Sequence, residues 1–271
     1  HEEANVRLCP ECGSQYIGGM RAGTEQVEGI IKKEFPSARV LRMDMDTTRQ
    51  KDGYEKILSA FANGEADILV GTQMIVKGHD FPKVTLVGIL AADLSLNVND
   101  YRAAERTFQL LTQAAGRAGR ERLAGEVVIQ TYHPEHYSIT AAAGQDYKTF
   151  YKEEIGYRDF MHYPPAGHML AILFEGLEEK KVDVFAEKAA AFLRTDTKGM
   201  KKPEDCVKLS IVGPADASIK KISDVYRKVL YLKADSYALL THKKDRLEQY
   251  IETCQMKELR IQFDFDPQNA Y

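Results

Sequence analysis

The sequence of 271 residues contains no tryptophan, only four cysteines and no apolar run long enough to span a bilayer. Cys9 and Cys12 lie close together while Cys206 and Cys254 are isolated, which is not a disulfide framework for a chain of this size. The formal net charge of −3 gives no global basic field that would attract nucleic acid or a membrane. We therefore expect a cytoplasmic chain without membrane contact, in which any nucleic-acid contact is local.

Several catalytic signatures are also missing from the sequence. It has no G-x-x-x-x-G-K-[ST] phosphate loop and no G-x-G-x-x-G run after a strand. It also lacks a G-x-S-x-G nucleophile elbow and an H-E-x-x-H zinc motif. By itself the chain has no visible means of holding a triphosphate, so the sequence does not favour a stand-alone hydrolase.

The length and one break in the pattern indicate two domains. Hydrophobic residues make up 44% and charged residues 28%, as in soluble globular proteins, and 271 residues suffice for two packed cores. Pro164 and Pro165 forbid a continuing helix, and Gly167 relaxes the backbone after them. The expected parts are a cysteine-bearing remnant at 1–18, a larger domain at 19–163 and a smaller domain at 164–271. The remnant suggests a piece of a longer protein.

Residues 19–163 alternate helical and strand patterns. Thr24 is placed to cap a helix that Pro36 ends, and an apolar helical stripe begins near Asp100. Continuous apolar runs at 66–72 and 84–90 suit strands that are buried on both faces of a parallel sheet. This alternation predicts an open parallel α/β sheet.

Residues 164–271 follow a different order of strand, helix, strand, strand, helix and strand. The expected strands are 169–175, 207–212, 227–234 and 258–264, and the expected helices are about 180–194 and 237–253. This order is the split βαβ pattern of ferredoxin-like domains, so we predict a smaller α+β domain.

Two segments of the larger domain contain groups that suit phosphates. "GTQMIVKGHDFP", Gly71 to Pro82, follows a buried strand and so lies where open α/β sheets bind ligands. "QAAGRAGR", Gln113 to Arg120, sets two arginines three residues apart, and an arginine fork can bind two phosphate oxygens. Each also has an ordinary interpretation, as a connecting loop and as surface charges at a helix C-terminus.

These segments resemble motifs V and VI of superfamily 2 helicases, and more closely those of the PriA family of replication-restart helicases, also called primosomal protein N-prime. "RMDMDTT", "DYRAAERTFQLLTQ", "GEVVIQTYHPEHY" and the closing "FDFDP" are similar to the same family. The resemblance covers almost the whole chain. It implies an α/β fold in which the second RecA-like helicase lobe precedes a ferredoxin-like C-terminal domain. The first lobe, which holds the phosphate loop and the magnesium-binding acidic motif, is expected to lie outside this chain.

The resemblance implies roles in ATP hydrolysis for particular residues. It makes Arg120 the arginine finger, Arg117 a second phosphate-sensing arginine and Gln113 a polar link between nucleotide and DNA. Gly78 and Asp80 would line the nucleotide side of motif V. ATP with magnesium needs the other lobe, so this chain alone is expected to be inactive.

The resemblance also implies DNA and zinc contacts. Thr24, Thr72 and Lys77 would face the DNA backbone, and Cys9 and Cys12 would be zinc ligands in the longer protein. Structural zinc takes four ligands, so the pair is half of a site and zinc in this chain stays doubtful. Forked and single-stranded DNA, the single-stranded-DNA-binding protein and other primosome proteins are the implied partners.

The C-terminal domain has a local basic cluster that could touch a phosphate backbone. Its members are Lys220, Lys221, Arg227 and Lys228. A solvated charged edge is the alternative. The function expected for the whole is the C-terminal half of an ATP-dependent DNA helicase that restarts stalled forks and initiates primosome assembly. The alternatives are a non-catalytic DNA-binding or primosome scaffold module, and another superfamily 2 DNA repair translocase.

Overall fold

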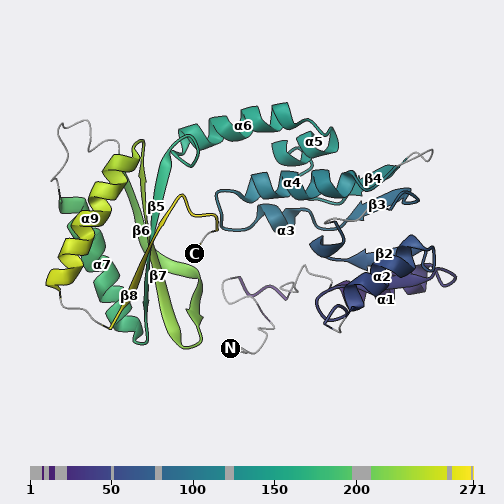
Figure 1. The fold of residues 1–271 in the computed structure, drawn as a ribbon, viewed down its shortest axis with the longest axis horizontal. Helices are drawn as coiled ribbons and strands as arrows, with labels where there is room; N and C mark the ends of the chain where they lie inside the picture. The colour runs from purple at the N-terminus through teal and green to yellow at the C-terminus, as the bar shows by residue number, and fades with distance from the viewer. Residues whose placement is uncertain are drawn as a thin grey trace. The chain divides into compact units, whose positions relative to one another are not determined.

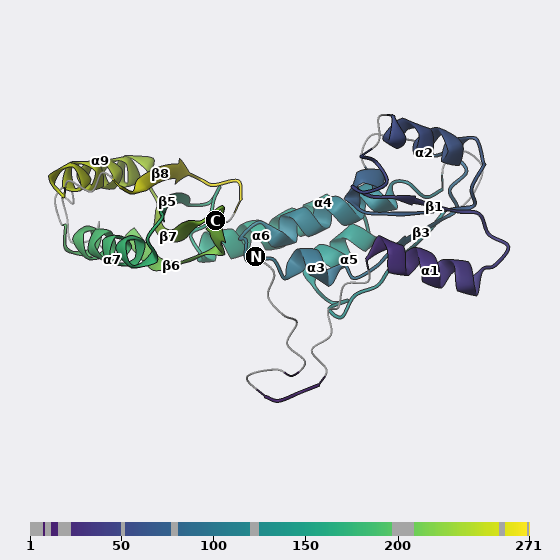
Figure 2. The ribbon, with the colours of Figure 1, turned by 90° about the horizontal axis from the view of Figure 1, so that it is seen from below.

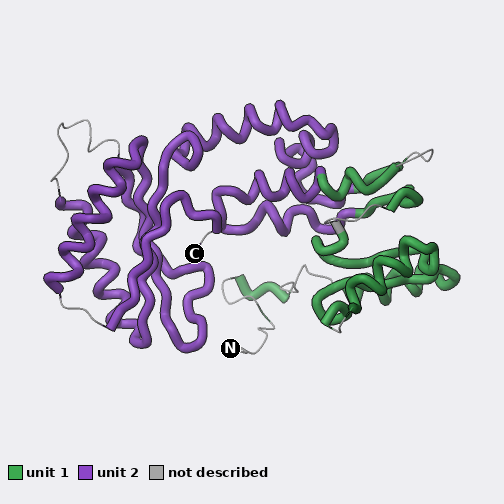
Figure 3. Tube along the Cα trace, viewed as in Figure 1, with its two compact units in different colours: residues 1–88, 113–128 green, residues 89–112, 129–271 purple. Residues whose placement is uncertain are grey.

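A computed structural model of the chain describes residues 8, 12–15, 23–49, 52–76, 81–119, 125–196, 209–254, 258–269 and 271. The chain divides into two compact units, His1–Gly88 with Gln113–Val128 and Ile89–Thr112 with Ile129–Tyr271 (Figure 3). The division cuts the sequence within three elements: β3 (Leu86–Ile89), α4 (Ala103–Ala115) and β4 (Glu126–Ile129). Among the described helices, none is both long enough and apolar enough to cross a bilayer.

The first unit is built around a parallel pair of strands. Its elements are α1 (Thr24–Glu34), β1 (Val40–Met43), α2 (Gly53–Ala62), β2 (Ile68–Gly71) and the short 3₁₀ helix η1 (Gln73–Val76). Val40 pairs with Ile68 at one end of the β1–β2 ladder and Met43 pairs with Gly71 at the other. Leu58 of α2 is buried with Met43, and Phe81 packs edge-on against Phe61. The apolar face of α2 therefore packs against β1.

The end of β2 needs a glycine. A Cβ at Gly71 would lie 2.4 Å from the carbonyl oxygen of Met43 on the paired strand, closer than any side chain tolerates. Glycine therefore lets the backbones of β1 and β2 approach closely at the point where β2 ends and η1 follows.

The predicted N-cap of α1 is wrong. Gly23 occupies the N-cap position in an extended conformation, without a side-chain cap, and Thr24 is already helical. The Thr24 hydroxyl instead donates to Asp44 Oδ2 at 2.6 Å. A carboxylate that follows β1 competes better for this hydroxyl than the local backbone does.

The second unit contains the remaining helices of the α/β part. These are α3 (Asp93–Leu96), most of α4, α5 (Tyr137–Ala143) and α6 (Tyr147–Phe160). Phe108 and Leu111 of the predicted α4 stripe are buried with Ile139 and Phe150, and the rings of Phe108 and Phe150 stack at 4.2 Å. β3 and β4, most of whose residues belong to the first unit, pair as a second two-stranded ladder. The described strands thus give two short ladders where one open sheet was expected.

The remaining elements form a four-stranded antiparallel sheet. They are β5 (His168–Gly176), α7 (Glu179–Thr195), β6 (Leu209–Ile222), β7 (Val225–Ala234), α9 (Tyr237–Thr253) and β8 (Arg260–Phe265). The strand order is β6-β7-β5-β8, and every described neighbour pair is antiparallel. Figure 1 and Figure 2 show α7 and α9 side by side on one face of this sheet. Leu170, Ile172 and Phe174 of β5 supply the buried side chains beneath them.

A buried ion-pair network holds α4 to α6. Arg158 of α6, 6% exposed, donates to Glu154 at 2.7 Å and to Glu105 of α4 at 2.7 Å. Its third nitrogen donates to the Pro164 carbonyl at 2.9 Å, and Tyr137 donates to Glu154 at 2.5 Å. Burial by itself would raise the pKa of Glu105, but the hydrogen bonds from arginine outweigh burial and lower it. The carboxylates of Glu105 and Glu154 therefore both pair with the Arg158 guanidinium.

Arg158→Met is expected to lower the free energy of unfolding of the second unit by about 3–5 kcal/mol, because it leaves the buried Glu154 carboxylate without its cation. Denaturant unfolding followed by circular dichroism measures this change. Lys181→Met is the control, since it removes a cation from exposed pairs with Glu178 and Glu258 and should cost less than about 1 kcal/mol. Equal costs for the two variants would contradict the central role of Arg158.

Candidate nucleotide and DNA site

The segment after α4 is a tight turn fixed to the neighbouring backbone. The amide of Arg117 donates to the Ala114 carbonyl at 3.0 Å, so the turn begins directly where α4 ends at Ala115. Gly119 then takes a positive φ of 70°, and its amide donates to the Val84 carbonyl at 3.1 Å, just before β3. Because both ends of the turn are bonded, the backbone of Arg117 is held in one place. Its side chain is half-buried.

Gly125, which precedes β4, packs directly on this turn. A Cβ at position 125 would lie 2.1 Å from the Gly119 nitrogen and 2.4 Å from the Ala118 carbonyl carbon. Only glycine permits this approach of two backbones. No local sequence pattern predicts this role of Gly125, since the contact depends on two segments that meet only in the folded chain.

The structure describes some of the other predicted site residues and leaves the rest outside the described ranges. Gln113 lies in the last turn of α4 with its side chain exposed, and Thr72 is exposed directly after β2. Lys77, Gly78, Asp80 and Arg120 lie outside the described residues. All six belong to the first unit. Their roles in nucleotide or DNA binding stay predictions.

Thr24, the remaining predicted DNA contact, is part of a polar cluster around Asp44. Asp44 is buried and accepts hydrogen bonds from the Thr24 hydroxyl, from the Thr47 amide at 2.9 Å and from the Asp46 amide at 3.1 Å. Arg42 adds an ion pair at 3.1 Å. The hydrogen bonds from Thr24 and Thr47 lower the pKa of Asp44 to about 2. The hydroxyl proton of Thr24 is thus committed to Asp44, a residue of the "RMDMDTT" segment that sequence reasoning gave no role.

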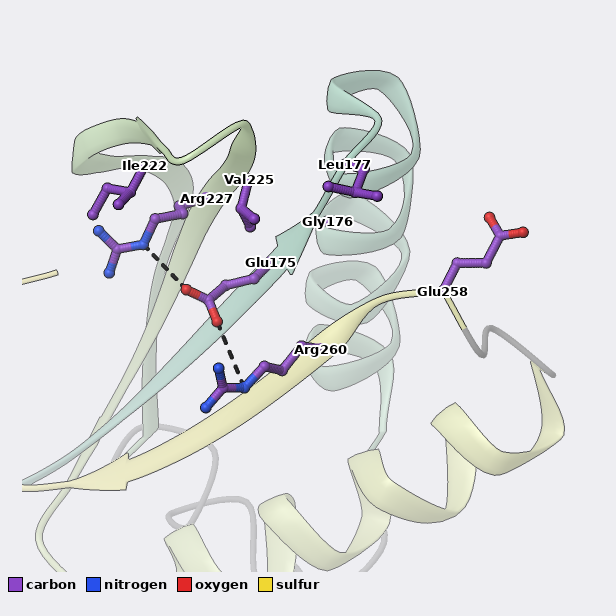
Figure 4. Close-up of a pocket in the computed structure, with 8 residues that line it drawn as sticks. All are labelled: Glu175, Gly176, Leu177, Ile222, Val225, Arg227, Glu258 and Arg260. Atoms are coloured by element: carbon purple, nitrogen blue, oxygen red, sulfur yellow. Dashed lines mark hydrogen bonds and ion pairs between the residues drawn. The ribbon is translucent and has the colours of Figure 1, made fainter.

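An acidic side chain pairs with each member of the predicted basic cluster. The pairs are Lys220–Glu179 (2.7 Å), Lys221–Asp224 (2.8 Å), Arg227–Glu175 (3.3 Å) and Lys228–Asp216 (3.0 Å). Figure 4 shows Glu175 between Arg227 and Arg260, in a pocket of about 440 Å³ that includes the exposed Leu177. The geometry favours the solvated charged edge over a phosphate-binding face.

The described residues alone do not form a zinc site. Within them, no group of three or more histidine, cysteine, aspartate or glutamate side chains is arranged to hold a metal ion. Cys12 is exposed, Cys9 lies outside the described residues, and Cys254 belongs to the second unit. A zinc site built on Cys9 and Cys12 would need donors from elsewhere.

Two family models match the chain. The helicase conserved C-terminal domain matches residues 20–122, and the primosomal protein N C-terminal domain matches residues 160–268. Replication restart protein PriA of Bacillus subtilis is 45% identical over 268 residues, which are 98% of this chain and 32% of that protein. The PriA protein of Synechocystis is 39% identical over 267 residues, which are 98% of this chain and 31% of that protein. A designed protein, Foldit4, aligns with 38% of this chain and 99% of its own at 9% identity and a TM-score of 0.28, which is too low to carry an argument.

The turn after α4 and the helicase match together define the class: the first part of the chain is a helicase C-terminal lobe of the RecA-like kind. The family is specified by the primosomal protein N C-terminal domain match at residues 160–268 and by the sequence identity to PriA proteins along nearly the whole chain. The chain belongs to the PriA family and corresponds to its C-terminal region. It spans about a third of the length of the PriA proteins it matches.

Thr24→Val is expected to lower the free energy of unfolding by about 1–2 kcal/mol at pH 7, because Asp44 loses a charge-assisted hydrogen bond. The pKa of Asp44, about 2, lies below the ordinary 3.8 of the unfolded chain. Its contribution is therefore complete above about pH 5 and is lost progressively as the pH falls toward 2. Unfolding measured between pH 7 and 2.5 should show the deficit of Thr24→Val shrinking with pH. Thr24→Ser keeps the hydroxyl and should behave like the unchanged chain, and a deficit independent of pH would contradict this account.

Gly125→Ala is expected to destabilise the first unit by about 1–3 kcal/mol, because the added methyl group overlaps the turn at Ala118 and Gly119. The matched control is Gly88→Ala in β3, where nothing lies within 4 Å of the added Cβ. Thermal unfolding of the two variants compares them directly. If both melt at the same temperature, the turn does not pack on Gly125 as described.

Proposed function

We propose that this chain is the C-terminal part of an ATP-dependent superfamily 2 DNA helicase that restarts stalled replication forks and begins primosome assembly. One observation carries the proposal: the bonded turn at Arg117, at the end of α4, lies in a segment that the helicase model matches. The PriA proteins of Bacillus subtilis and Synechocystis support the restart role by their names and their identity to this chain.

In this proposal the arginines after α4 act on ATP that is held by the phosphate-loop lobe of the longer protein. Arg117 and Arg120 would donate to the γ-phosphoryl oxygens and stabilise the charge that develops as water attacks in line. Gly78 and Asp80 would line the nucleotide side of motif V, and magnesium would come with ATP on the other lobe. The fixed backbone at Arg117 matters because an arginine finger acts only when it is already oriented.

The same proposal assigns the DNA track to the first unit. Thr72 and Lys77 would contact the backbone of single-stranded or forked DNA. The exposed Gln113 would link this track to the nucleotide. Thr24 would contribute through the helix N-terminus, because its hydroxyl proton is donated to Asp44.

Further assignments complete the proposal. The strand order β6-β7-β5-β8 supports a ferredoxin-like C-terminal domain, with the domain boundary at 163/164 and the cysteine remnant at 1–18. Zinc would be held by Cys9 and Cys12 only together with donors of the longer protein. The single-stranded-DNA-binding protein and other primosome proteins would be partners, and the protein would act in the cytoplasm.

ATP hydrolysis tests the proposal. The purified chain of 271 residues should show no ATP turnover, because it lacks a phosphate loop. In the longer protein, Arg117→Ala and Arg120→Ala should each reduce DNA-stimulated turnover about 10³-fold or more. Arg39→Ala is the matched control, since Arg39 lies in an exposed pair with Asp67 and should leave turnover unchanged. Turnover by this chain alone that Arg120→Ala abolishes would contradict the proposal, as would full activity of the Arg117→Ala protein.

A further inference from the structure

Two segments that the proposed function leaves unused lie against each other in the second unit. The first is "DYRAAER", Asp100 to Arg106, at the start of α4, and the second is Pro267–Asn269, which continues "FDFDP". The Tyr101 hydroxyl donates to the Pro267 carbonyl at 3.1 Å. Arg102 donates to the Gln268 side chain, and Arg106 donates to the Gln268 carbonyl and to Asn269 Oδ1, the latter at 3.0 Å. These contacts join residues more than 160 positions apart.

Residues 266–269, here called the C-terminal strap, are anchored to the four-stranded sheet. The Asp266 amide donates to the Met169 carbonyl at 2.7 Å, and Asp266 Oδ1 accepts from the Met169 amide at 2.7 Å. The Tyr237 hydroxyl also donates to Asp266. Beyond the strap, the Tyr271 carbonyl accepts from the Ser218 amide at 2.7 Å and from its hydroxyl at 2.8 Å. The chain on both sides of the strap is therefore fixed to the sheet.

The arginines that receive the strap are oriented from the helix side. Arg106 pairs with Asp100 at 2.8 Å, and Arg102 pairs with Glu105 at 3.2 Å. Glu105 is in turn bonded to the buried Arg158. At the start of α4, Arg102 and Arg106 thus contact the strap, while Glu105 contacts α6.

Helix α4 continues without interruption from these contacts to the turn at Arg117. At about 1.5 Å per residue, its 13 residues span roughly 20 Å. A helix transmits a displacement of one end to the other because its backbone hydrogen bonds keep it rigid. The position of its first turns therefore bears on the position of Arg117, whose amide donates to the Ala114 carbonyl of α4.

We propose that the C-terminal strap positions α4, and that Arg102 and Arg106 are positioning residues for Arg117. The physical contact stands independently of the proposed function, while its consequence for ATP hydrolysis rests on that function. Loss of the strap would leave Arg117 present but less well oriented, so turnover would fall while nucleotide binding by the other lobe persisted.

Hydrogen exchange of the 271-residue chain tests the contact. Arg106→Met should speed exchange about fivefold or more in peptides that cover 103–119, and leave α7 unchanged. Arg106→Lys, which can reach one acceptor, should recover part of the protection. Arg260→Met is the matched control, because Arg260 is an exposed arginine that faces Glu175 instead of the strap. Gln268→Ala gives an independent variant that keeps Arg106 and should act in the same direction.

Outcomes that contradict the inference are distinct from those that contradict the proposed function. Unchanged exchange in 103–119, or faster exchange throughout the second unit, would overturn the positioning role. In the longer protein, Arg106→Met should lower kcat about tenfold with KM for ATP unchanged, and Arg106→Lys should be intermediate. Faster exchange with an unchanged kcat would overturn the catalytic consequence of the strap. If Arg117→Ala also leaves turnover unchanged, the proposed function itself fails, whatever the exchange shows.

Discussion

The buried guanidinium of Arg158 is the interaction on which the second unit depends. One cation satisfies the carboxylates of Glu105 and Glu154 and the carbonyl of Pro164, so α4, α6 and the start of the C-terminal domain meet at a single side chain. An arginine suits this position because its planar fork donates in several directions and keeps its charge when buried. The helix that leads to the candidate nucleotide site is therefore fixed by polar contacts at its beginning and by apolar packing along its length.

The distribution of charge separates two kinds of positive residue in this chain. The cations of the C-terminal domain have acidic partners contributed by α7, β5 and β6, so their charges are already matched within the domain. Arg117 follows a helix among small residues, where the backbone of its turn is fixed by the Gly119 amide and packed on Gly125. Rigid placement, more than total charge, distinguishes the candidate site from the basic edge.

The sequence predicted most elements and few of the contacts between them. The order and limits of β5, α7, β7, α9 and β8 follow apolar periodicity, and the structure confirms them within about two residues. β6 extends to Ile222, ten residues beyond its predicted end. The sequence does not signal this hairpin, because Ser223 and Asp224 take the positive φ values of its turn where glycine is usual. Thr24 was misread as a cap because Asp44, twenty residues away, takes its hydroxyl. The acidic partners of Lys220 and Lys228 and the contact of Arg106 with the C-terminal strap depend on tertiary pairing that no local pattern encodes.

Hydrogen exchange at Gly116–Gly119 with a non-hydrolysable ATP analogue tests the central claim most directly. The claim is that the turn after α4 is one side of a nucleotide site whose other side lies on a separate lobe. The account predicts that the analogue and magnesium protect these amides in the longer protein and leave them unchanged in the chain of 271 residues. Protection in this chain alone, or in neither protein, would contradict it.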